Sequence, residues 1–261
     1  MIDLNKTLEI AIKIAEKAGD FVMKHHGTDL DIKTKKTEND LVTEIDKESQ
    51  RIIISAIKEE FSDHGFIGEE ASEENKLSES PYEWIIDPID GTINFVRARE
   101  DFGINIALQE DGNLILGIMY LPMLNQMFTA TKDGGAFLNG NPIKLRNTKN
   151  MMDAILCSNL TKRAKKDSNG ILQISTPACA SLHNYGCAAQ EIARILLGHN
   201  DGVFFDGVGL WDVAPGALMV KEAGGDYFID YENPGDVKCV ASTSAIFEEL
   251  KLFLEQSEMT A

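Results

Sequence analysis

Two short apolar runs in the first third of the chain end in acidic residues, and this pattern constrains the fold more than any other. The runs are GFIGEE at residues 65–70 and EWIIDPIDGT at residues 83–92. Short apolar runs bounded by turn-forming residues are typical of buried strands. Carboxylates resist burial unless an opposite charge or hydrogen bonds compensate them. We therefore expect buried strands whose carboxyl ends carry charge, together with something that neutralises it.

The segments around these runs predict two helices before the acids and a meander after them. Apolar residues recur at three- and four-residue steps across residues 3–25, which indicates an amphipathic helix. Thr43 and Asp46 have the spacing of a capping box that opens a second helix. The polar residues 33–40 are typical of a loop or short hairpin. Across residues 102–145, apolar alternation broken by Asp-Gly, Gly-Gly and Asn-Gly pairs predicts an antiparallel meander.

The second half of the chain alternates helices and strands. The expected elements are a helix at 186–198 closed by Gly198, a strand at 202–206, a helix at 213–225 closed by two glycines, strands at 226–230 and 238–242, and a helix near 244–255. A meander followed by alternating elements predicts a layered α/β architecture. The pattern contains no linker, so we expect a single domain over residues 1–261, with lobes at about 1–145 and 146–261.

The charge balance disfavours polyanionic partners. The chain has 42 acidic and 25 basic residues among 261, and its formal net charge is −17. Such a surface repels nucleic acid and anionic membranes, so we expect neither as a direct partner. No uncharged apolar run is long enough to cross a bilayer, and the N-terminus does not resemble a signal peptide. The four cysteines form no CxxC pair, which favours a reduced, cytoplasmic setting.

The string around Pro88 has the composition of a magnesium site. Asp87 ends a strand, Pro88 is expected to force a turn, and Asp90 follows, so both carboxylates can face one pocket with the Ile89 carbonyl between them. Mg²⁺ prefers such oxygen ligands together with water and phosphate. Gly91 then allows backbone amides to approach an anion, and Thr92 can open a helix whose N-terminus attracts phosphate.

Other interpretations of this string are open when it is taken alone. A strand followed by an Asp-Pro turn and an N-capping residue gives the same letters. The DxDGT motif of haloacid-dehalogenase-type phosphatases differs by one residue in spacing, and neither an EF-hand nor a P-loop pattern is present. Glu69 and Glu70 close the preceding strand, and Asp212 precedes a helix with Pro215 in its first turn. Solvation in a loop and helix N-capping are the simpler roles for these acids.

The combination of motifs resembles the inositol monophosphatase family, which consists of Mg²⁺-dependent, lithium-sensitive phosphatases. The matching motifs are GEE at 68–70, DPIDGTINF at 87–95, WDVAPGALMVKEAGG at 211–225 and DLVTEID at 40–46. They occur in the family's order and spacing over nearly the whole chain. The resemblance implies an αβαβα sandwich of the type shared with fructose-1,6-bisphosphatase, and a homodimer.

The resemblance also implies a role for each acid. A first Mg²⁺ would be held by Glu69, Asp87 and the Ile89 carbonyl, and a second by Asp87, Asp90 and Asp212. Glu69 would also hold a third, more weakly bound Mg²⁺. The catalytic residues that the family pattern implies are Glu69, Asp46 and Thr92, of which Asp46 and Thr92 orient the attacking water. Gly91 and Thr92 would give amides to the phosphate, and Lys35 would stand near it.

The substrate side departs from the family pattern. GCAAQEIA at 186–193 matches the family's Gly-[Ser/Thr]-Ala-Ala helix start, which implies that Gly186, Cys187 and Ala188 contact substrate, as Asp212 does. His183 stands where an arginine is usual. Phe205 occupies the position of the family's inositol-binding glutamate, and Asp206 beside it is the expected substitute.

These expectations favour a phosphomonoesterase that hydrolyses myo-inositol 1-phosphate or a similar small polyol phosphate through water activated by metal, without a covalent intermediate. Within the superfamily, the alternatives are a 3′(2′),5′-bisphosphate nucleotidase, a histidinol phosphatase and a fructose-1,6-bisphosphatase. From a different class, some relatives are non-catalytic partners of the transcription machinery, and that function is also open.

Overall fold

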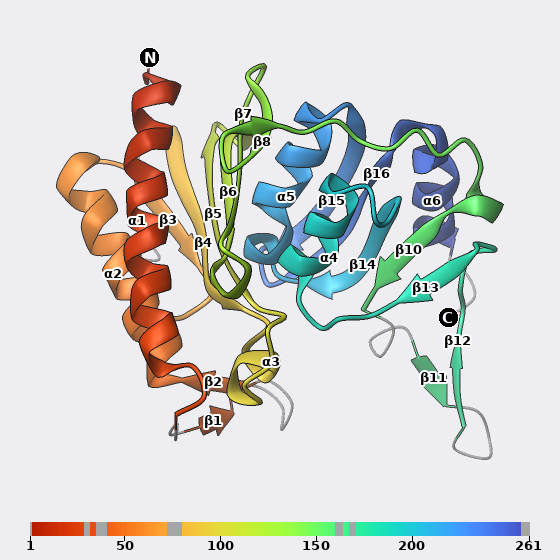
Figure 1. Cartoon of the computed structure of the whole chain (residues 1–261), viewed down its shortest axis with the longest axis horizontal. Coiled ribbons are helices and arrows are strands. Elements are labelled where there is room, and N and C mark those ends of the chain that lie inside the picture. The colour runs from red at the N-terminus through yellow and green to blue at the C-terminus, as the bar shows by residue number, and fades with distance from the viewer. Residues whose placement is uncertain are drawn as a thin grey trace.

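The chain folds into alternating layers of helices and sheets (Figure 1). The computed structural model describes residues 2–28, 32–34, 41–71, 80–159, 164–166 and 171–256. Helices α1 and α2 cover one face of a seven-stranded sheet, and α4 and α5 lie between that sheet and a five-stranded one. Helix α6 covers the outer face of the second sheet. The expected αβαβα arrangement is confirmed.

Side-chain caps define the start of the first two long helices. Helix α1 (Leu4–His25) follows Asp3, whose carboxylate accepts the amides of Asn5 and Lys6. Helix α2 (Glu44–Glu60) begins with the expected capping box, in which the Thr43 amide donates to Asp46 Oδ2 at 2.8 Å. Short strands β1 (Ile32–Thr34) and β2 (Leu41–Thr43) pair antiparallel before α2. Lys35 lies outside the described residues.

The seven-stranded sheet contains the two acid-ended runs as neighbours. In spatial order its strands are β3 (Gly65–Gly68), β4 (Tyr82–Asp90), β5 (Gly103–Glu110), β6 (Asn113–Leu121), β7 (Gln126–Thr131), β8 (Gly135–Leu138) and β9 (Asn141–Pro142). β3 and β4 are parallel, with Gly68 opposite Ile86, and the other neighbours are antiparallel. The expected meander is confirmed, and the acids after β3 and in β4 lie at the same edge.

The expected turn at Pro88 is wrong, because β4 continues through the proline to Asp90. Its pairing with β5 shifts register between Asp87 and Asp90, which marks a bulge. A bulge leaves a residue outside the ladder, so the missing N–H of proline costs no ladder hydrogen bond there. The bulge changes the direction of the side chains on either side of Pro88 while the strand stays in the sheet.

The five-stranded sheet is mixed. Its order is β13 (Ser181–His183), β10 (Ile155–Ser158), β14 (Gly202–Val208), β16 (Asp236–Thr243) and β15 (Gly225–Asn233). β10 is parallel to both of its neighbours, and the remaining pairs are antiparallel. The expected strands at β14, β15 and β16 are confirmed. β10, β13 and the hairpin of β11 (Ala164–Lys166) and β12 (Leu172–Ile174) were not predicted, because three- and four-residue strands give little periodicity.

The remaining helices include one start that differs from expectation. Helix α4 (Ala188–Leu196) and helix α6 (Ser244–Gln256) match the expected helices, whereas α5 (Leu210–Glu222) begins three residues early. Asp212 is therefore the third residue of α5 rather than the residue before the helix, and Pro215 lies inside the helix. The short elements are α3 (Thr92–Val96) and the 3₁₀ turns η1 (Pro122–Leu124) and η2 (Met151–Asp153). Among the described helices, none combines the length and apolarity that a membrane crossing requires.

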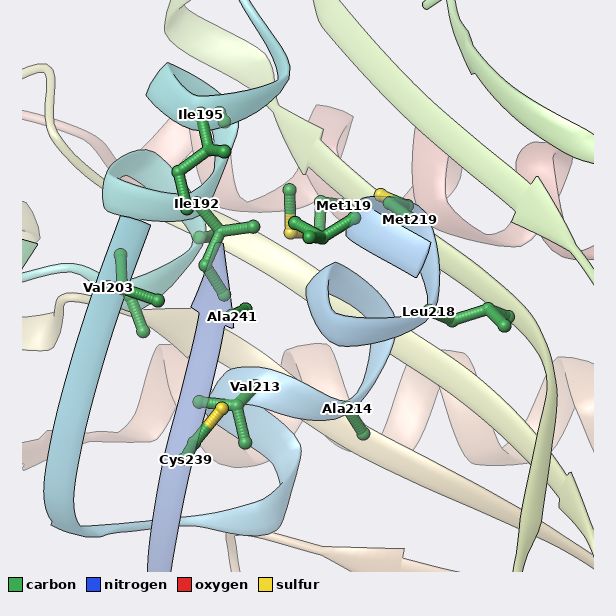
Figure 2. Packing of buried hydrophobic residues seen from close by; sticks show 14 of the residues in the cluster. Met119, Ile192, Ile195, Val203, Val213, Ala214, Leu218, Met219, Cys239 and Ala241 are labelled. Atoms are coloured by element: carbon green, nitrogen blue, oxygen red, sulfur yellow. The ribbon is translucent and has the colours of Figure 1, made fainter. Parts of the chain in front are cut away.

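The central helical layer is packed between the two sheets (Figure 2). Met119 from β6 lies on one side of it, and Val203, Cys239 and Ala241 from the second sheet lie on the other, with Ile192 of α4 between them. Helix α5 has almost no exposed face, and small residues let it approach the sheet closely. A Cβ added to Gly117 on β6 would lie 2.9 Å from the Pro215 carbonyl oxygen. This packing fixes the first turn of α5, and Asp212 with it, against the seven-stranded sheet.

Candidate metal centre

Three aspartates from two elements meet at the edge of the seven-stranded sheet. Asp87 and Asp90 on β4 and Asp212 on α5 each offer a carboxylate oxygen, and these oxygens lie within 4.8 Å of one another. Glu69 directly follows β3, and its amide donates to the Ile86 carbonyl of β4 at 3.1 Å. Its carboxylate is near enough that its charge raises the pKa of both Asp87 and Asp90. The structure thus brings together the four acids to which the family resemblance assigns the metals.

The electrostatics of this cluster favour a bound cation. Burial raises the pKa of Asp87 well above its usual range, and the charges of Glu69, Asp90 and Asp212 raise it further. Asp87 Oδ1 accepts the Ile89 amide at 3.0 Å, but Oδ2 is buried, and within the described residues it accepts no hydrogen bond from an N–H group. Neither Asp87 nor Asp90 forms an ion pair with a basic side chain of the described residues. Buried, convergent oxygen ligands without a basic partner fit a hard divalent cation.

Asp90 also joins the seven-stranded sheet to helix α4. Its Oδ1 accepts the Ala188 amide at 3.1 Å and its Oδ2 accepts the Ala189 amide, both at the start of α4. Burial raises the pKa of Asp90 to about 6, although hydrogen bonds from the Ala189 amide, the Cys187 thiol and the Ala188 amide oppose that rise. A carboxylate at a helix N-terminus is stabilised by the free amides there. Asp90 therefore holds α4 against β4.

The position of Asp212 is set by its own helix. Its Oδ2 accepts the amide of Gly209 at 2.8 Å, as expected for an acid at the third helical position. Asn105 on β5 is fully buried beside it, and Asn105 Nδ2 lies 3.4 Å from the Asp212 carbonyl oxygen and 3.5 Å from Asp90 Oδ2. These contacts connect the first turn of α5 with the acids of β4.

The loop after β4 needs glycine at its first position. Gly91 has a φ of +84°, and a Cβ there would lie 2.9 Å from the Asp101 carbonyl oxygen and 3.0 Å from Cys187 Cβ. Asn94, one turn later, donates through Nδ2 to the carbonyls of Asp101 and Tyr185 at 2.8 and 2.9 Å. The segment that the sequence assigned to phosphate is therefore held closely against the turn that precedes α4.

Thr92 lies between two hydrogen-bond acceptors. Its Oγ1 is 3.1 Å from Asp46 Oδ1 and 3.1 Å from the Ile89 carbonyl oxygen. Asp46 is fully buried, and its other oxygen accepts both the amide and the hydroxyl of Thr43. Because Thr92 has a single hydroxyl proton and both neighbours only accept, Thr92 Oγ1 can interact with a water only as an acceptor.

A small cavity adjoins the acids. It has a volume of about 190 Å³, and its lining consists of Asp90, Asn159, Asn184, Gly186, Cys187, Ala188, Glu191, Phe205, Val208 and Asp212. Gly186, Cys187 and Ala188 are therefore placed beside the acids, as the sequence suggested. Sequence reasoning missed Asn159, Asn184, Glu191 and Val208. Glu191 alone gave a signal, because it is the one acidic residue of helix α4.

Asp206 is not part of this lining. Side chains alternate along β14, so Phe205 packs in the central layer whereas Phe204 packs in the core under α6. The alternation puts Asp206 on the same face as Phe204. Its backbone amide and carbonyl pair with the Asn159 side chain at 3.1 and 2.7 Å. A substrate contact by Asp206 stays a prediction, and Phe205 takes the place beside the acids.

Known proteins of the same fold and sequence pattern are numerous. Residues 3–253 match the model of the inositol monophosphatase family. The chain is 35% identical over 231 residues to the Nus factor SuhB of Pasteurella multocida (strain Pm70), covering 85% of this chain and 84% of that protein. It is 33% identical over 221 residues to the inositol-1-monophosphatase of Bacillus subtilis (strain 168), covering 84% and 83%. The solved structure of an IMPase from Thermotoga maritima superimposes with a TM-score of 0.82 at 29% identity, covering 98% of this chain and 99% of the other.

Proposed function

The chain belongs to the inositol monophosphatase family, and we propose that it is a magnesium-dependent phosphomonoesterase acting on myo-inositol 1-phosphate or a similar small polyol phosphate. The observation that carries this proposal is the convergence of Asp87, Asp90 and Asp212, with Glu69 beside them, where no basic side chain of the described residues pairs with Asp87 or Asp90. The name of the Bacillus subtilis relative is consistent with the same reaction.

Each acid has a proposed place in the metal centre. One Mg²⁺ would be held by Glu69, Asp87 and the Ile89 carbonyl. A second would be held by Asp87, Asp90 and Asp212, and Glu69 would also hold a third, more weakly bound Mg²⁺. Magnesium bound there would make a water more acidic and stabilise negative charge on the phosphate and the departing alcohol. The buried Asp87 Oδ2 supports this assignment, because it accepts no N–H group of the described residues, and Asp87 carries the cost of desolvation and the repulsion of Glu69, Asp90 and Asp212.

Thr92 and Asp46 would orient the attacking water. When the Thr92 hydroxyl donates to Asp46 Oδ1, its oxygen lone pairs can accept a hydrogen bond from the water. Asp46 is itself held by Thr43, so the direction of this relay is fixed before substrate binds. The water then keeps a lone pair for attack on phosphorus, and no covalent intermediate with the protein is needed.

The remaining residues of the site would bind substrate. The amides of Gly91 and Thr92 would receive the phosphate, since glycine, which has no Cβ, lets an anion approach the backbone closely. Gly186, Cys187 and Ala188 would line the alcohol side, together with Asp212, and Asp206 stays the weakest of the proposed contacts. Because the chain carries a net charge of −17, local cations rather than the overall field would attract the dianionic phosphate.

A panel of phosphate esters tests the proposed activity. The panel comprises myo-inositol 1-phosphate, 3′-phosphoadenosine 5′-phosphate, histidinol phosphate and fructose 1,6-bisphosphate, each with Mg²⁺, with EDTA and with added lithium. We expect Mg²⁺-dependent, lithium-inhibited release of phosphate, lost in Asp87→Asn and kept in Asp236→Asn, which changes an exposed acid. Absence of Mg²⁺-dependent release from every ester would contradict the proposal.

A second function deserves its own test because several relatives are named Nus factors. In that function the chain would act in the cytoplasm, as a homodimer, as a partner of the transcription machinery. Such a role needs the fold but not the metal centre, so Asp87→Asn should retain it while the phosphatase activity is lost. Equal loss of both in a folded Asp87→Asn protein would argue against an independent partner role.

A further inference from the structure

The cavity beside the acids has a mostly apolar wall. Phe205, Val208, Cys187 and Ala188 supply that wall and are each at least nine-tenths buried. At about 190 Å³ the cavity is small, since pockets for drug-sized ligands enclose about 300–1,000 Å³. Asp90 and Asp212 also line it, so the alcohol part of a phosphate ester bound at these acids would occupy it.

Glu191 is the acidic side chain of the wall apart from the metal-centre aspartates. One of its oxygens is already hydrogen-bonded and the other is buried. Glu191 Oε1 accepts the amides of Tyr185 and Gly186 at 2.6 and 3.1 Å. Glu191 Oε2 has less than 1 Å² of accessible surface, so a substrate hydroxyl cannot reach it in this conformation. Burial raises the pKa of Glu191 to about 7, which agrees with a carboxyl group shielded from solvent.

Of the two amide side chains in the wall, Asn159 is held in place by β14. It donates one N–H to the Asp206 carbonyl at 2.7 Å, and its oxygen accepts the Asp206 amide at 3.1 Å. Asn184 is exposed at the rim of the cavity. A substrate that fills the cavity therefore meets the exposed Asn184 and the metal-centre aspartates, and the rest of the wall offers it mainly apolar atoms.

A heavily hydroxylated alcohol fits such a wall poorly. Each hydroxyl that leaves water for an apolar surface without a new partner costs free energy, whereas a hydrocarbon face gains from the same transfer. We infer that Phe205 is a specificity-determining residue, which selects phosphate monoesters whose alcohol presents an apolar face to it and few hydroxyl groups. The inference rests on the proposed phosphomonoesterase function and places the preferred substrate at the less hydroxylated end of that class.

Two esters with the same six-membered ring test this selection. Cyclohexyl phosphate lacks the hydroxyl groups of myo-inositol 1-phosphate, but the two differ in leaving-group reactivity, so their rates alone are not comparable. The informative quantity is the ratio of their kcat/KM values in a variant divided by the same ratio in the wild type, because intrinsic reactivity cancels. Phosphate release is measured with Mg²⁺ at one pH.

The test variant is Phe205→Gln, which replaces the apolar wall with an amide. Losing an apolar contact of this size changes the discrimination between two substrates by about 10- to 100-fold. We therefore expect the ratio of kcat/KM for cyclohexyl phosphate to kcat/KM for myo-inositol 1-phosphate to fall by at least about 10-fold. Phe204→Gln is the matched control, since Phe204 is equally buried in the same strand but faces the core under α6. Its ratio should stay at the wild-type value. A Phe205→Gln ratio within about twofold of wild type would overturn the inference.

A wild-type measurement covers the case in which Phe205→Gln does not fold. Under conditions where chemistry is slower than substrate dissociation, KM reports binding. We expect cyclohexyl phosphate to have a KM at least about 10-fold below that of myo-inositol 1-phosphate, and equal values or the reverse order would overturn the inference. Absence of Mg²⁺-dependent turnover of both esters would refute the proposed function and the inference with it, whereas failure of the inference alone leaves turnover intact.

Discussion

Replacing Asp87 with asparagine should stabilise the metal-free protein. Asparagine has nearly the same shape but no charge, and Asp87 is buried among Glu69, Asp90 and Asp212. At an effective dielectric constant of about 20, two unit charges no more than 4.8 Å apart repel by at least roughly 3.5 kcal/mol. Proton uptake by the cluster relieves much of this repulsion, so we expect a gain of about 1–2 kcal/mol, or about 2–8 °C in Tm.

The same substitution should abolish stabilisation by magnesium, because Asp87 is shared by both proposed principal ions. Wild-type protein with free Mg²⁺ at about 100 times its Kd gains about 2.7 kcal/mol of unfolding free energy, or roughly 5–10 °C in Tm. For Asp87→Asn we expect a shift smaller than about 2 °C. Thermal unfolding followed by circular dichroism, in EDTA and in Mg²⁺ at pH 7.5, measures both effects.

Asp87→Asn is expected to raise the metal-free Tm and to abolish the Mg²⁺-induced shift, and the two effects together are specific to the metal centre. Asp236→Asn, which changes an exposed aspartate, should leave both the metal-free Tm and the Mg²⁺ shift at their wild-type values. If Asp87→Asn lowered the metal-free Tm, repulsion within the cluster would not be the dominant effect. If the variant kept the full Mg²⁺ shift, the ions would bind elsewhere.

Three other outcomes follow from the geometry. The pKa of Asp90 is raised to about 6 in the folded chain, against about 3.9 in the unfolded chain, so the contribution of Asp90 to metal-free stability falls as the pH rises through that window. Because Asp90 loses its proton over the same range, the Mg²⁺-induced gain in Tm should grow from pH 5 to pH 8. Gly91→Ala combines a positive φ with a close backbone contact, so it should lower the free energy of unfolding by about 2–4 kcal/mol and slow phosphate release at least about 10-fold. Gly112→Ala, where φ is +77° and the space is open, should lower the free energy of unfolding by about 1 kcal/mol and leave phosphate release unchanged. Unfolding and phosphate-release assays measure both effects. Thr92→Val should lower kcat by at least about 100-fold and Thr92→Ser by less than about 10-fold, since serine keeps the hydroxyl next to Asp46. If steady-state kinetics gave the same kcat for both variants, the relay from Thr92 to Asp46 would be contradicted.

Local rules were enough to predict the elements that carry the acids. The Thr43–Asp46 capping box, the apolar runs before Glu69 and Asp87, and the glycine turns of the meander each depend on a few neighbouring residues. Once those strands were taken as neighbours, the meeting of their ends followed from the parallel pairing of β3 with β4. The sequence therefore indicated which acids converge at the edge of this sheet.

Features that depend on tertiary packing were not predictable in the same way. The proline of β4 is accommodated by a bulge, which is set by the pairing with β5 rather than by the local sequence. Helix α5 starts at Leu210 because burial between two sheets and the Gly209–Asp212 hydrogen bond outweigh the usual avoidance of an interior Pro215. Whether Phe205 or Asp206 faces the cavity depends on the register of β14, and a shift of one residue exchanges the two.

Anomalous scattering from Mn²⁺, which takes the oxygen ligands of Mg²⁺, tests the central claim most directly. Crystals grown with Mn²⁺ and phosphate should show one peak between Asp87, Asp90 and Asp212 and another next to Glu69, Asp87 and the Ile89 carbonyl, with phosphate density at the Gly91–Thr92 amides. Peaks confined to other surfaces, or none at saturating Mn²⁺, would contradict the assignment of these acids to a metal centre.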